Sequence, residues 1–172
     1  IEVESELGKG STFTVTPKHK IADESYYVKK HLEESGISRE ILKDRSILLA
    51  EDNDLNAEIA AVILERAGLK VERVEDGLQC ISRITEMPAG TYDIILMDIQ
   101  MPKMDGYKAT QTIRNLSDQE KACIPIIAMT ANAFEEDKRA AIAAGMNGHI
   151  AKPIQVDKLL SILAEMIRQQ EN

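Results

Sequence analysis

From Ser46 onward, short apolar runs alternate with longer amphipathic segments. Each short run is apolar throughout, which is typical of strands buried on both faces, and the longer segments carry apolar residues at helical spacing. The pattern predicts five strands, at residues 47–50, 71–74, 92–97, 125–129 and 148–151. It also predicts five helices, at residues 55–67, 78–87, 107–116, 132–144 and 156–169.

Five strand–helix repeats of this kind predict an α/β domain with a five-stranded parallel sheet and helices on both faces. Gly68 is expected to end the first helix as a left-handed C-terminal residue, and Pro88 follows the second helix. In such doubly wound sheets, ligands bind in a crevice at the carboxyl ends of the strands. The residues that follow each predicted strand are therefore the candidates for a functional site.

The residues that end the predicted strands carry a coherent chemistry. Glu51 and Asp52 follow the first strand, Asp98 follows the third, Thr130 the fourth and Lys152 the fifth. Three crowded carboxylates repel one another unless a cation lies among them, and oxygen ligands suit Mg²⁺. An aspartate can attack phosphorus, and a metal with a lysine can neutralise charge on the phosphoryl oxygens. The set predicts phosphoryl transfer.

The composition limits the number of domains and the classes of function that the chain can have. The 172 residues suffice for one ordinary domain and a remainder, and 44% hydrophobic with 29% charged residues is a globular composition. A net charge of −8 and 3% aromatic residues disfavour nucleic-acid binding. The apolar runs are too short to span a bilayer, so no membrane contact is expected. Two cysteines without a CxxC motif favour reduced thiols and a cytoplasmic location. A chain that begins at Ile1 without Met suggests a piece of a longer protein.

Four motifs in order carry a resemblance to a known family. They are LLAEDN at 48–53, LMDIQMPKMDG at 96–106, IAMTA at 127–131 and AKP at 151–153. Residues 46–172 resemble the response-regulator receiver domains of two-component phosphorelays. The resemblance implies a flavodoxin-like three-layer fold with strand order 2-1-3-4-5, for which the family is a standard example.

The resemblance also implies a metal site. Asp98 would be the phosphoacceptor and, with Asp52, a direct ligand of Mg²⁺. Glu51 would bind the ion through water, and the backbone carbonyl of Gln100 would complete the protein's share of the ligands.

A further group of residues would respond to the phosphoryl group. Thr130 would move toward it and Lys152 would pair with it, and the Lys152–Pro153 bond is often cis in such domains. Receivers usually carry Tyr or Phe three residues before the lysine, whereas this chain has His149. His149 is either a half-exposed edge residue or a possible switch that responds to pH.

The first 45 residues differ in pattern from the rest. Residues 1–17 alternate around GKGS at 8–11 and resemble the last hairpin of a histidine-kinase ATP-binding domain. Residues 18–45 are a charged linker in which 25–35 could form a short helix. His19 and His31 lie in charged sequence, so no residue qualifies as a kinase phosphorylation histidine. The fragment is not expected to be a kinase, although its parent chain would be a hybrid histidine kinase.

The leading hypothesis is a receiver that accepts phosphate on Asp98 from a phosphohistidine of the same parent chain. The phosphate would then pass to a His-containing phosphotransfer protein. The first alternative is an interaction module that works without phosphorylation, but such a module needs neither the acidic set nor Thr130 and Lys152. The second alternative is a phosphatase, which lacks support because Gln100 stands where a second acid would be required.

Overall fold

The computed structural model describes residues 2–6, 10–14, 39–131 and 135–170. Its main body is a five-stranded parallel sheet in the order β4-β3-β5-β6-β7. This order, 2-1-3-4-5 within the sheet, confirms the predicted doubly wound architecture. The strands are β3 (Ser46–Ala50), β4 (Lys70–Val74), β5 (Ile94–Asp98), β6 (Ile126–Thr130) and β7 (Gly148–Ala151).

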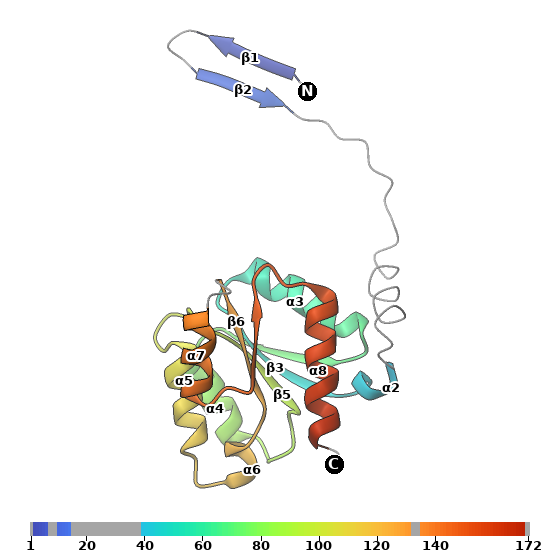
Figure 1. Cartoon of the computed structure of the whole chain (residues 1–172), viewed down its shortest axis with the longest axis vertical. Helices are drawn as coiled ribbons and strands as arrows, with labels where there is room; N and C mark the ends of the chain where they lie inside the picture. Colours follow the sequence, from blue (N-terminus) through green and yellow to red (C-terminus); the bar gives the residue numbers. More distant parts are fainter. Residues whose placement is uncertain (1, 7–9, 15–38, 132–134, 171–172) are drawn as a thin grey trace.

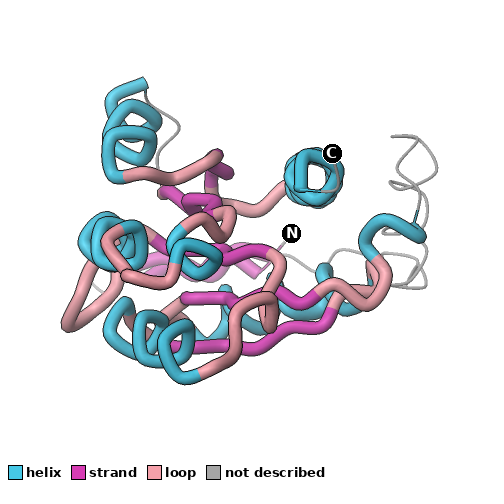
Figure 2. Tube along the Cα trace, turned by 90° about the horizontal axis from the view of Figure 1, so that it is seen from below, coloured by secondary structure: helices cyan, strands magenta, loops and turns pink. Residues whose placement is uncertain are grey.

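Helices cover both faces of the sheet (Figure 2). The helices of the body are α2 (Arg39–Leu42), α3 (Asp54–Arg66), α4 (Gly77–Glu86), α5 (Gly106–Arg114), α6 (Gln119–Ala122), α7 (Glu135–Ala144) and α8 (Val156–Gln170). Helices α3 and α8 pack on one face, where Leu49 and Leu96 point (Figure 1). Helices α4, α5 and α7 pack on the other face, where Leu48 and Ile95 point. None of the described helices is long and apolar enough to cross a membrane.

Local sequence signals set the ends of these helices. Asn53, Asp76 and Asp105 cap α3, α4 and α5, each with a side chain that accepts a hydrogen bond from a backbone N–H in the first turn. Gly68 follows α3 with φ of +98°, as the sequence predicted. The four-residue α6 was not predicted, although Asp118 caps it. Residues 132–134, which the prediction assigned to the start of α7, lie outside the described residues.

The short helix α2 lies within the range that was expected to be a linker. Its Leu42 is fully buried in the cluster formed by β3, α3 and α8, and Ile41 packs against the same cluster. The end of the predicted linker therefore packs on the domain through Ile41 and Leu42, which are removed from water there. The helix expected at residues 25–35 lies outside the described part of the chain.

The N-terminal residues form a separate antiparallel pair. Strands β1 (Glu2–Glu6) and β2 (Gly10–Thr14) pair with Glu2 opposite Thr14 and Glu6 opposite Gly10. This confirms the two alternating strands that the sequence predicted. The assignment of residues 1–17 to a kinase ATP-binding domain, of 18–45 to a linker and of 46–172 to a receiver stays a prediction.

Candidate functional site

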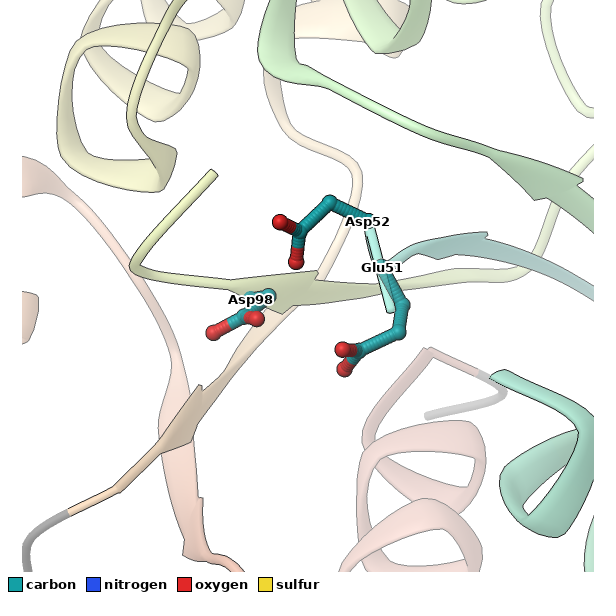
Figure 3. Close-up of side chains that lie close together, drawn as sticks. All are labelled: Glu51, Asp52 and Asp98. Atoms are coloured by element: carbon teal, nitrogen blue, oxygen red, sulfur yellow. The ribbon is translucent and has the colours of Figure 1, made fainter. Parts of the chain in front are cut away.

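The polar residues that end the strands converge at one edge of the sheet. Glu51 and Asp52 follow β3, and Asp98 is the last residue of the neighbouring β5. Ligand atoms of these three side chains lie within 4.8 Å of one another (Figure 3). The structure therefore brings together the acidic residues that the sequence predicted, because parallel strands in register end at the same edge.

Lys152 joins this acidic cluster from β7's side of the sheet. Its Nζ lies 2.5 Å from Glu51 Oε2 and 2.7 Å from Asp98 Oδ2, so one ammonium bridges two carboxylates. Glu51 is 1% exposed and Asp98 is 6% exposed, whereas Asp52 faces solvent. A buried carboxylate is costly without a cationic partner, so Lys152 keeps both of these acids compatible with burial.

Burial raises the pKa of Asp98 above its ordinary value, and the nearby charge of Glu51 acts in the same direction. The hydrogen bond and charge of Lys152 and the Gln100 N–H oppose this shift. For Lys152, burial acts to lower the pKa, but the hydrogen bonds with Asp98 and Glu51 outweigh it and the pKa is raised. The ammonium is therefore fully charged at neutral pH, where it favours the ionised form of Asp98.

The loop after β5 is held close to Asp98. The Gln100 N–H donates to Asp98 Oδ1 at 3.2 Å, and the Gly106 N–H donates to the Ile99 carbonyl at 3.0 Å. Gly106 has no space for a side chain, because a Cβ there would clash with the Asp98 carbonyl oxygen and lie 2.9 Å from Met97 Cγ. The glycine thus lets the start of α5 approach the backbone of Asp98.

An ion pair holds the same loop from α4. Lys103, which has φ of +60°, extends its Nζ to 2.6 Å from Asp76 Oδ2, and the Asp76 side chain is only 1% exposed. Burial acts to raise the pKa of Asp76, but hydrogen bonds from Lys103 and from the Gln79 N–H outweigh it and the pKa is lowered. The Gly77 N–H also donates to the Met104 carbonyl at 3.2 Å.

A guanidinium from β4 contacts the backbone that carries the first two acids. Arg73 Nε donates to the Glu51 carbonyl at 3.0 Å, and its Nη2 donates to the Asp52 carbonyl at 3.2 Å. Sequence reasoning missed Arg73 and the Lys103–Asp76 pair. A pattern of apolar and polar residues carries no signal for either, because both depend on which strands and loops become neighbours.

The remaining predicted residues lie around the crevice. Thr130 ends β6 and is 4% exposed, and the Lys152 N–H donates to its carbonyl at 2.7 Å. The Lys152–Pro153 peptide bond is cis, as the resemblance implied. His149 is partly exposed and lines a cavity of about 250 Å³ together with Lys138 and Lys158. Burial, and then the charge of Lys138, lower the pKa of His149.

This arrangement fits a hard divalent cation beside the buried carboxylate of Asp98. The donors are carboxylate oxygens, which Mg²⁺ and Ca²⁺ prefer, and the exposed Asp52 leaves one side of the cluster open to solvent. Asp98 presents one oxygen to Lys152 and the other to the Gln100 N–H, so its carboxylate is held in a fixed orientation. Fixed orientation and nearby positive charge are the requirements for attack on a phosphoryl group.

Comparison with known proteins agrees with this geometry. The chain is 37% identical over 123 residues to the peroxide stress-activated histidine kinase mak1 of Schizosaccharomyces pombe, covering 71% of this chain and 8% of the kinase. The receiver domain of sensor histidine kinase PA1611 from Pseudomonas aeruginosa, solved with a magnesium ion in its active-site cleft, is 38% identical with a TM-score of 0.66. That match covers 73% of this chain and 98% of the solved chain.

A third similarity concerns a receiver in a complex. The structure of the Saccharomyces cerevisiae histidine phosphotransfer protein Ypd1 with the receiver domain of Ssk1 matches with a TM-score of 0.68 and 26% identity, over 74% of this chain and 92% of that chain. The family profile of the response regulator receiver domain matches residues 47–164, from the second residue of β3 to the middle of α8. This chain belongs to the response regulator receiver domain family.

Proposed function

We propose that this domain accepts a phosphoryl group on Asp98 from a phosphohistidine and passes it on to a histidine phosphotransfer protein. The observation that supports this most directly is the fixed, buried Asp98 carboxylate with Lys152 Nζ 2.7 Å from one oxygen and two further carboxylates beside it. A pure interaction module would have no need for three acids and a lysine in this crevice, whose crowding costs stability.

In the proposed reaction, a carboxylate oxygen of Asp98 attacks phosphorus. A new O–P bond forms, the P–N bond to the donor imidazole breaks, and the imidazole nitrogen keeps the electron pair. Glu51, Asp52, Asp98 and the Gln100 carbonyl would hold Mg²⁺. When bound, the ion supplies positive charge that offsets the charge on the phosphoryl oxygens.

The chain's own residues have separate tasks in this proposal. Lys152 pairs with Asp98 before transfer and with a phosphoryl oxygen afterwards. Thr130 lies at the end of the neighbouring β6, from where its hydroxyl can donate to a phosphoryl oxygen. We propose that Thr130 and His149 move together when Asp98 is phosphorylated.

An exposed apolar stripe on α3 is the proposed contact surface for the phosphodonor. Leu55, Ile59 and Val62 are 65%, 48% and 37% exposed, and their spacing puts them on one face of the helix. Helix α3 begins directly after the acidic residues that follow β3. A partner that brings a phosphohistidine to Asp98 would therefore reach this stripe.

The test is phosphoryl uptake from acetyl phosphate and Mg²⁺, measured by intact-protein mass. The wild type should gain one phosphoryl group and Asp98→Asn should gain none. Asp105→Asn is the matched control, because Asn caps a helix as well as Asp does and Asp105 caps α5 nearby. Equal uptake by wild type and Asp98→Asn would refute the assignment.

A second measurement distinguishes contact with the protein donor from the phosphoryl transfer step itself. Ile59→Lys should slow transfer from a phosphorylated histidine phosphotransfer protein of the same organism, while uptake from acetyl phosphate stays normal. Ile142→Lys is the control, because Ile142 is 68% exposed on α7. Equal transfer rates for both variants would refute α3 as the contact surface.

A further inference from the structure

Arg73 contacts the segment that carries two of the acids, and the proposed reaction gives it no task. It is the fourth residue of β4, and its side chain is 29% exposed. Its Nε and Nη2 donate to the carbonyl oxygens of Glu51 and Asp52, at 3.0 and 3.2 Å. The same guanidinium lies 2.8 Å from Asp54 Oδ1. It thus contacts three of the first four residues after β3.

The parallel register explains how Arg73 reaches this segment. Arg73 pairs with Leu49, and the following Val74 accepts a hydrogen bond from the Glu51 N–H at 3.0 Å. The segment that leaves β3 is therefore bonded to β4 through its backbone N–H and through two consecutive carbonyls. A guanidinium has several donors in a rigid planar fork, so it can bond two carbonyls at once, which a lysine ammonium cannot do with the same fixed geometry.

The positive charge of Arg73 and its hydrogen bonds to the backbone should have opposite effects on the binding of a divalent cation. A positive charge beside a cluster of carboxylates weakens the attraction of that cluster for a divalent cation. If Arg73 acted only as a charge, its loss would strengthen cation binding. If it acts by holding the backbone of Glu51 and Asp52, its loss would weaken cation binding. The two roles therefore predict effects of opposite sign.

We propose that Arg73 is a positioning residue for the divalent-cation site, holding the Glu51–Asp52 backbone so that both carboxylates face Asp98. This inference rests on the proposed Mg²⁺ site. The ion pair between Arg73 and Asp54 matters less, because the Asp54 side chain is 92% exposed and exposed ion pairs contribute little to stability. Asp52 is itself exposed, so few packing contacts hold its carboxylate and the fixed backbone has to do so.

The test measures Mg²⁺ affinity of the whole chain by isothermal titration calorimetry for four proteins. These are the wild type, Arg73→Met, Arg73→Lys and Asp54→Asn. Arg73→Met should bind Mg²⁺ about tenfold more weakly, the lower end of the loss that follows removal of groups that orient metal ligands. Arg73→Lys should also bind more weakly, although the charge is kept. Asp54→Asn, which removes only the ion pair, should stay within about twofold of the wild type.

A spectroscopic measurement accompanies the affinities. In the metal-free protein, the amide resonance of Asp52 should shift in both Arg73 variants and stay close to its wild-type position in Asp54→Asn. Arg73→Lys covers the case in which Arg73→Met does not fold. Equal or tighter Mg²⁺ binding by the Arg73 variants would overturn the inference while the wild-type titration upheld the metal site. Absence of Mg²⁺ binding by the wild type would overturn the proposed function, and this inference with it.

Discussion

The glycine that begins α5 is the sharpest place to test how closely this helix packs against the backbone of Asp98. In Gly106→Ala, the new Cβ would clash with the carbonyl oxygen of Asp98 and lie 2.9 Å from Met97 Cγ. Neither atom can move easily, because β5 is the central strand of the sheet and all five of its residues are buried. The start of α5 and the end of β5 would have to separate by about 1 Å to restore normal contact.

The free energy of this change has two parts. Forcing extra volume into a packed backbone contact costs about 3 kcal/mol, at the upper end of the usual range because the opposing atom is main chain. Alanine loses less backbone entropy than glycine on folding, by about 1 kcal/mol at most, which offsets part of this cost. The net loss of unfolding free energy is therefore about 2 kcal/mol, or about 6 °C in the melting temperature of a domain of this size.

Thermal and urea unfolding would measure this loss, and acetyl phosphate uptake would measure its effect on Asp98. Uptake should slow, because the displaced backbone belongs to Asp98, the proposed phosphoacceptor. Gly148→Ala is the matched control, since a Cβ there meets only Ile127 and Ile162 side-chain atoms at 3.9 Å. Its stability should stay within about 1 kcal/mol of the wild type. Wild-type stability and uptake in Gly106→Ala would refute the reasoning.

Three further predictions test the charges and thiols. Lys152→Met leaves Glu51 and Asp98 without their shared ammonium. The free energy of unfolding in urea should therefore fall by about 3 kcal/mol, and phosphoryl uptake should slow. An unchanged free energy of unfolding together with unchanged uptake would contradict the site. Asp76→Asn removes the partner of Lys103 and should cost about 2 kcal/mol at neutral pH. Because the pKa of Asp76 is lowered in the folded state, its contribution is present above its ordinary pKa and is lost as the pH falls through the folded-state pKa. The variant's stability should therefore fall less in acid than the wild type's, and an identical pH dependence would contradict this. Burial raises the pKa of Cys80 to about 12, so a thiol reagent should label only the exposed Cys123 in the native protein, and both cysteines after unfolding; labelling of Cys80 in the native protein would contradict its burial.

Much of the fold could be predicted because its signals are local. Apolar runs such as Ile94–Met97 indicate strands buried on both faces, and Asn53 and Gly68 mark the two ends of α3. The short helices escaped prediction for a local reason as well. Helix α6 has four residues, too few to show a period, and α2 was hidden in a charged segment. The burial of Leu42 depends on α8, which is distant in the sequence but belongs to the same apolar cluster.

In the candidate site too, some features could be predicted from the sequence and others could not. Its acids, Thr130 and Lys152 could be identified from the sequence because each lies at or just after the end of a strand, and parallel strands bring their carboxyl ends to one edge. Only the tertiary structure decided which groups pair. Lys152 bridges Glu51 and Asp98, and Lys103 reaches Asp76 across the loop.

The role of Arg73 also could not be predicted from the sequence. Its contacts with two carbonyls follow from the pairing of β4 with β3, two strands with a whole helix between them in the chain. The sequence by itself determined the elements, their order and the acidic chemistry, because propensity, capping and hydrophobic period act over a few residues. The tertiary structure decided burial, ion pairing and the hydrogen bonds from Arg73 to the Glu51 and Asp52 carbonyls, because these depend on distances between residues that only packing brings together.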